Sequence, residues 1–196
     1  MKTKCISLLL SLLLMLGLTG CGAPDVPMEV TIDGNTIVLG QTTMQDLIDL
    51  GYEPHLQSRQ DVAQDGDTYI TFYYSLDKGA GNQFWADVAV PWSGSSNIND
   101  ETTRSATEGI VRSVKFSISS TEKVTAYYNG VDIQDMTFDY GIEEWGAKKD
   151  DRTTVPAYLA TVKRGSLRME SESTMDEEFH ELTVSLFLKE LEKMQK

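Results

Sequence analysis

The chain has 196 residues, with 17 lysines and arginines against 30 aspartates and glutamates, and a formal net charge of -13 at pH 7. This acidic surplus argues against a nucleic-acid partner, whose phosphates need a basic face, and against a domain that lies flat on anionic lipid headgroups. Its two cysteines, Cys5 and Cys21, leave no disulfide or thiolate metal site in the chain after Cys21.

The beginning of the chain has the composition of an export signal. Lys2 and Lys4 precede an apolar run over residues 6–18. This run is shorter than the roughly 20 apolar residues that a membrane-spanning helix needs, so a cleaved signal is favoured. We predict a signal peptide over residues 1–20.

The end of this segment, Leu18-Thr19-Gly20-Cys21, resembles the lipobox of bacterial lipoproteins. The resemblance implies cleavage before Cys21 and attachment of diacylglycerol, with fatty acids such as palmitate, to the Cys21 thiol. Two or three acyl chains anchor a protein durably, and this predicts a protein on the extracytoplasmic face of the cell membrane. An ordinary secretory signal whose cleavage leaves a cysteine is the alternative.

Residues 21–28 contain two prolines and are predicted to form a short, stiff tether. Two stretches with the same order of elements follow. A turn dipeptide, Asp33-Gly34 or Asn129-Gly130, predicts a β-hairpin in each, and a threonine-capped segment that ends at Gly51 or Gly146 predicts a short helix. Strands are then predicted over 69–76, 84–90 and 110–118 in the first stretch and over 155–164, 167–173 and 179–188 in the second.

This order predicts an α+β fold of two similar helix-on-antiparallel-sheet units in tandem, over residues 29–120 and 121–196. Chance similarity between two ordinary α+β segments is the alternative. The pattern resembles the tandem units of β-lactamase-inhibitor-protein-like domains and small envelope lipoproteins that assist outer-membrane assembly. The resemblance implies a protein-binding module.

The sequence gives little indication of catalysis. His55 and His180 are its two histidines, and it has no Gly-x-Ser-x-Gly motif. We place His55 in a solvated loop and His180 at the edge of a packed strand. The spacings typical of zinc sites are missing, and residues 61–67 do not match a calcium loop. We therefore expect no enzyme activity, no cofactor and no metal.

Aromatic residues are the remaining indication of function. Trp85 is out of phase with the apolar positions of its strand, so it should point away from the core. We predict a contact surface formed by Trp85, Trp92, Tyr73, Tyr127 and Trp145. Burial of these aromatics for purely structural reasons is the alternative.

The favoured hypothesis is a non-enzymatic interaction module of the cell envelope that binds another envelope protein. Two alternatives stay open. One is a lipoprotein that binds a sugar or wall fragment by tryptophan stacking, and the less favoured one is a carboxylate-dependent hydrolase, since acidic residues are abundant.

Overall fold

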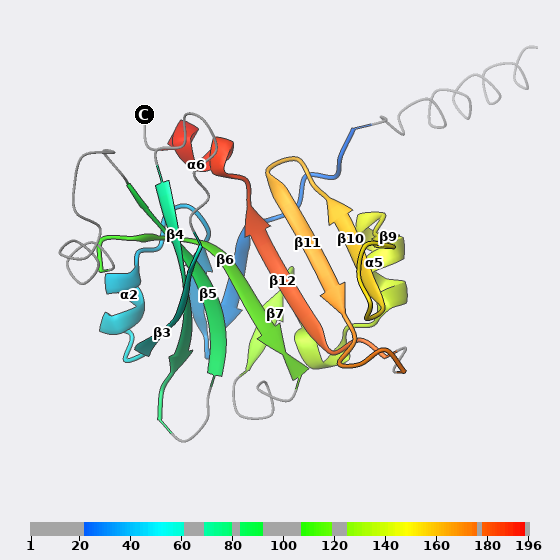
Figure 1. The fold of residues 1–196 in the computed structure, drawn as a ribbon, viewed down its shortest axis with the longest axis horizontal. Coiled ribbons are helices and arrows are strands. Elements are labelled where there is room, and N and C mark those ends of the chain that lie inside the picture. Colours follow the sequence, from blue (N-terminus) through cyan, green and yellow to red (C-terminus); the bar gives the residue numbers. More distant parts are fainter. Residues whose placement is uncertain are drawn as a thin grey trace, which may run out of the picture.

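The computed structural model describes residues 22–60, 69–79, 83–91, 107–118, 125–175 and 178–194. Within these ranges the chain forms two antiparallel sheets, three α-helices and one 3₁₀ helix (Figure 1). The predicted signal peptide, Cys21, Trp92 and the run 61–67 lie outside the described residues.

The smaller sheet has four strands in the order β2-β1-β7-β8. They are β1 (Glu29–Ile32), β2 (Asn35–Val38), β7 (Ala126–Tyr128) and β8 (Val131–Asp132). Both predicted hairpins are confirmed: Asp33 and Gly34, and likewise Asn129 and Gly130, have positive φ, as a type I′ turn requires. The two hairpins join through β1 and β7, where Val30 lies opposite Tyr128.

The larger sheet has eight strands in the order β3-β4-β5-β6-β12-β11-β10-β9. They are β3 (Glu53–Gln60), β4 (Tyr69–Asp77), β5 (Gln83–Pro91), β6 (Ile110–Ser117), β9 (Lys148–Lys149), β10 (Ala157–Thr161), β11 (Gly165–Glu170) and β12 (Glu181–Leu186). The first four strands and the last four meet at the β6–β12 pair, where Val114 lies opposite Val184.

The helices are short: α2 (Met44–Asp49), α5 (Phe138–Trp145) and α6 (Leu188–Met194), with the 3₁₀ helix η1 (Ile133–Asp135) before α5. Helix α5 packs against β10 of the larger sheet (Figure 1). Thr43 and Asp46 form a capping box at α2, and Thr137 caps α5, which ends at Gly146 in the left-handed conformation. Among the described helices, none combines the length and apolar character that a membrane crossing requires.

One hydrophobic core joins the two sheets. In Figure 1 the smaller sheet lies behind the larger one, and residues from both belong to a single buried cluster. Its fully buried members include Ile32, Leu76, Phe84, Val114, Tyr128, Leu167 and Val184. The alternation predicted for β4, β5 and β6 is confirmed, because Phe72, Leu76 and their neighbours on that face are buried.

The predicted α+β class, with two helix-on-sheet units in tandem, is wrong. The chain is mostly β, because the hairpins build a second sheet and the remaining strands merge into one continuous sheet. Helices α2 and α5 have six and eight residues and so span only about 9–12 Å. An eight-stranded sheet is about 34 Å wide. Such short helices cannot cover it alone, and the apolar face is buried in a cluster that joins residues of both sheets and of the helices.

Candidate functional site

The larger sheet has a second face, here called the outer face, which points away from the smaller sheet (Figure 1). It consists of the side chains that alternate with the core residues. One row across it contains Ser75, Trp85, Lys115, Thr183 and Arg168, each opposite the next on neighbouring strands. Because a pleated strand turns successive side chains to opposite faces, this polar row follows from the buried apolar row beside it.

Trp85 and Tyr73 are the aromatic residues of the outer face that the sequence predicted. Trp85 is half-buried, and the Lys115 ammonium lies 5.7 Å from its ring centroid, within cation–π range. Tyr73 lies opposite Asp87 on β5, so it is a diagonal neighbour of Trp85. Burial, with the nearby charges of Asp87 and Glu181, raises the pKa of Tyr73 to about 12. Its hydroxyl therefore stays neutral near pH 7.

Ion pairs surround these aromatics. Lys115 pairs with Glu181 at 2.7 Å, and Asp87 pairs with Arg112 at 3.0 Å. Burial raises the pKa of Asp87, and the adjacent Arg112 opposes that rise. Further along the face, Arg168 bridges Glu170 and Asp150. The outer face thus combines an aromatic centre with paired charges around it.

The other predicted contact residues do not join this surface. Tyr127 lies on the smaller sheet between buried Ala126 and Tyr128, so its side chain points to the opposite side of the molecule. Trp145 is 3% exposed and packs edge-on against Tyr128 and Tyr140, with ring centroids 5.4 and 5.3 Å away. Trp145 is therefore a core residue. Trp92 is outside the described residues.

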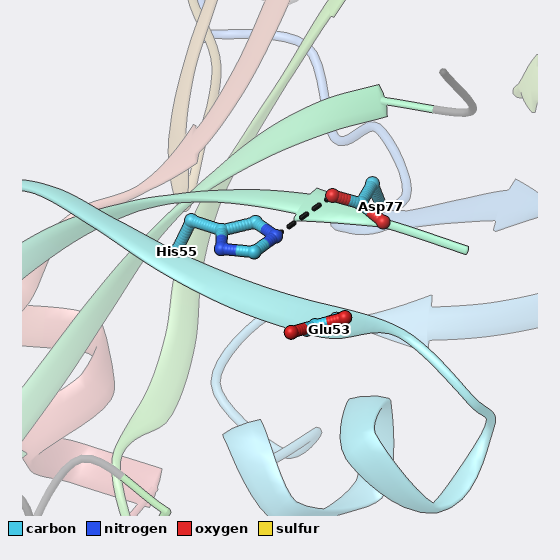
Figure 2. Close-up of side chains that lie close together, drawn as sticks. All are labelled: Glu53, His55 and Asp77. Atoms are coloured by element: carbon cyan, nitrogen blue, oxygen red, sulfur yellow. Dashed lines mark hydrogen bonds and ion pairs between the residues drawn. The ribbon is translucent and has the colours of Figure 1, made fainter. Parts of the chain in front are cut away.

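A second cluster lies at the edge of the outer face (Figure 2). His55 Nε2 is 2.8 Å from Asp77 Oδ2, and Glu53 lies beside them, so that one possible ligand atom from each side chain falls within 4.8 Å of the others. The prediction that His55 lies in a loop is wrong, because it belongs to β3. It lies opposite Ser75, which lies opposite Trp85, so the cluster shares the face of Trp85.

His180 has a different environment. Its Nε2 lies 2.9 Å from Ser117 Oγ, and its Nδ1 lies 3.7 Å from a Glu172 oxygen. The Glu172 distance exceeds a hydrogen bond. Ser117 is only 4% exposed, which leaves its hydroxyl poorly open to a substrate. This trio therefore gives little support to a serine hydrolase.

Among the cavities lined by described residues, three of about 440, 560 and 450 Å³ lie beside the tether, at α6 and at the start of α5. Trp85 and Trp145 line none of the three, so these cavities do not support ligand stacking on either tryptophan. Comparison of the chain with models of protein families, with curated proteins and with solved structures found no match.

Proposed function

We propose that this protein is a non-enzymatic lipoprotein, anchored through Cys21 to the extracytoplasmic face of a membrane, whose outer face binds another envelope protein. The anchor is supported by Leu18-Thr19-Gly20-Cys21. The binding role rests on one observation: Trp85 and Tyr73 lie together on a sheet face among paired charges. Aromatic residues at the centre of a polar surround are typical of protein-binding surfaces.

The tether, residues 21–28, is bonded to the folded domain, and this supports a fixed orientation of the domain relative to the membrane. The Lys163 amide donates to the Pro24 carbonyl at 3.0 Å, and the Tyr128 hydroxyl donates to the Pro27 carbonyl at 2.9 Å. Cys21 precedes Pro24 by three residues, so the chain between them spans at most about 11 Å. A lipid on Cys21 would hold the β10–β11 turn close to the bilayer. The end of β4 and the start of β5 lie at the opposite end of the sheet (Figure 1).

The binding role is tested by photocrosslinking in living cells from two tyrosine positions. A photoreactive phenylalanine at position 73 reports on the outer face, and the same residue at position 127 reports on the opposite side of the molecule. We expect one abundant adduct from position 73, none from 127, and loss of the adduct when Trp85→Ala is added. Equal adducts from both positions, or none from position 73, would contradict the proposal.

The anchor is tested separately by metabolic labelling with a palmitate analogue. We expect the wild-type protein to carry the label and to fractionate with membranes. Cys21→Ser should lose the label, because serine has no thiol to which diacylglycerol could be attached. An unlabelled wild-type protein, or equal labelling of Cys21→Ser, would contradict lipid anchoring without bearing on the outer face.

A further inference from the structure

We propose that Glu53, His55 and Asp77 form a binding site for a divalent transition-metal ion, with Zn²⁺ as the test case. The strand register brings the three side chains together. Glu53 lies directly opposite Asp77, and His55 is two residues further along β3, hence on the same face. Figure 2 shows the His55 ring directed at Asp77, with the Glu53 carboxylate beside them.

The donor set determines the class of ion. One imidazole nitrogen with two carboxylate oxygens suits Zn²⁺ and its transition-metal neighbours, whereas Ca²⁺ and Mg²⁺ prefer oxygen alone. Around zinc, donors at about 2.0–2.2 Å from the ion lie roughly 3.0–3.5 Å from one another. The three ligand atoms already lie within 4.8 Å of one another, and His55 and Asp77 are 2.8 Å apart. Small side-chain rotations would therefore close the site.

A neighbouring backbone amide holds the Asp77 carboxylate in place, and side-chain contacts of Gln57 hold the strand that carries His55. The Gly79 amide donates to Asp77 Oδ1 at 3.2 Å, which directs the second oxygen, Oδ2, at His55. The Gln57 side chain donates to the His55 carbonyl at 3.2 Å and to Ser75 Oγ at 2.9 Å. These contacts fix the bulge between Leu56 and Ser58. The Gly79 bond to Asp77 is of the kind that orients a ligand before an ion arrives.

The exposure of the cluster leaves room for further ligands. The His55 and Asp77 side chains are 45% and 25% exposed. Three protein ligands on one side of the ion leave at least one coordination position open to solvent. The bound ion would thus neutralise the two carboxylates and add a ligand-accepting point to the outer face, whatever the partner of that face is. The site rests on its own geometry and needs neither the lipid anchor nor a protein partner.

The chain offers a matched control, because His55 and His180 are its two histidines. The experiment follows the histidine ring signals of the full-length protein, labelled with ¹³C-histidine in detergent micelles, by NMR during Zn²⁺ titration. We expect one set of signals, assigned to His55 by its loss in His55→Ala, to shift and saturate at one equivalent. The His180 signals, engaged with Ser117, should stay in place. Ca²⁺ should leave both sets unchanged.

Calorimetry gives the second measurement. We expect His55→Ala and Asp77→Asn each to weaken Zn²⁺ binding by at least about tenfold, while His180→Ala binds like the wild type. Thermal unfolding without metal verifies that all three variants are folded. Wild-type affinity in His55→Ala, equal shifts of both histidines, or no shift of either would overturn the proposal.

Discussion

The hydroxyl of Tyr128 donates a hydrogen bond to the carbonyl of Pro27, 2.9 Å away, and so joins the tether to the centre of the smaller sheet. Tyr128 is completely buried, and its ring packs edge-on against Trp145. Burial raises the pKa of Tyr128 well above its usual range, so its hydroxyl remains a donor. The residues after Pro24 therefore belong to the folded domain and do not form a free spacer.

Tyr128→Phe should lower the free energy of unfolding by about 1 kcal/mol, because the Pro27 carbonyl loses its partner while the ring remains. Urea denaturation measures the change. Tyr127→Phe is the control on the same strand: its side chain is 37% exposed, and the effect should stay within about 0.5 kcal/mol. A loss as large in the Tyr127 variant would show that the tether bond contributes nothing specific.

Gly165→Ala should destabilise the domain because a Cβ at Gly165 would overlap the backbone carbonyl of Ser185 on β12. Backbone in a paired strand cannot move aside cheaply, so we expect a loss of about 1–3 kcal/mol or more in urea denaturation. Gly141→Ala is the comparison: its Cβ would meet the flexible Met169 side chain, and alanine favours helix α5. If Gly141→Ala costs as much, backbone overlap is not the cause.

Local signals account for what the sequence predicts correctly about the fold. The Asn129-Gly130 turn, the Thr43 cap and the alternation in β4 each depend on residues close together in the chain. Which strands pair with each other does not depend on such local residues. Val30 pairs with Tyr128, far away in the sequence, and an alternating pattern states only that one face is buried, not what covers it. The error in fold class arises at this step.

Of the two clusters on the outer face, the aromatic one can be predicted from local sequence and the Glu53–His55–Asp77 one cannot. Trp85 and Tyr73 are predictable as outward residues because each is out of phase with an apolar strand face. The Glu53–His55–Asp77 cluster is not, because β3 is an edge strand rich in polar residues and shows no apolar alternation. The proximity of His55 to Asp77 also depends on strand register, which a single sequence does not determine.

Trp85 and Trp145 should differ sharply in their response to truncation. Trp145→Ala should cost about 3–5 kcal/mol, since it empties a buried site between Tyr128 and Tyr140. Trp85→Ala should cost about 1 kcal/mol, chiefly its cation–π contact with Lys115. Urea denaturation followed by circular dichroism measures both. A large loss in the Trp85 variant would mean that this residue serves the fold and not a partner.

Trp145→Phe refines this comparison. The Trp145 Nε1 group is buried and has no hydrogen-bond partner among the described residues. Phenylalanine keeps an aromatic ring against Tyr128 and removes the unpaired N–H, so the loss should be clearly smaller than for alanine. Equal losses would indicate that the indole N–H has a partner beyond the described part of the chain.

Asp150 should give the domain a pH-dependent stability. Its side chain is 4% exposed and accepts hydrogen bonds from Arg152, at 2.7 Å, and from Arg168, at 2.9 Å. The Arg152 hydrogen bonds, supported by Arg168, hold the pKa of Asp150 well below its usual range. Because the folded-state pKa is depressed, the stabilisation is complete above the unfolded pKa of about 3.9 and is lost as the pH falls toward the folded value.

Asp150→Asn should therefore melt below the wild type at pH 7, and the difference in melting temperature should shrink as the pH falls from about 5 to 2. The amide of the variant carries no charge for the two arginines to pair with, so the variant lacks this stabilisation at every pH. Thermal melts followed by circular dichroism across this range measure the difference. Asp25→Asn is the control, because Asp25 pairs with Lys163 at the exposed surface, where ion pairs add little. A constant gap between the wild type and Asp150→Asn throughout the titration would mean that the carboxylate charge does not stabilise the fold.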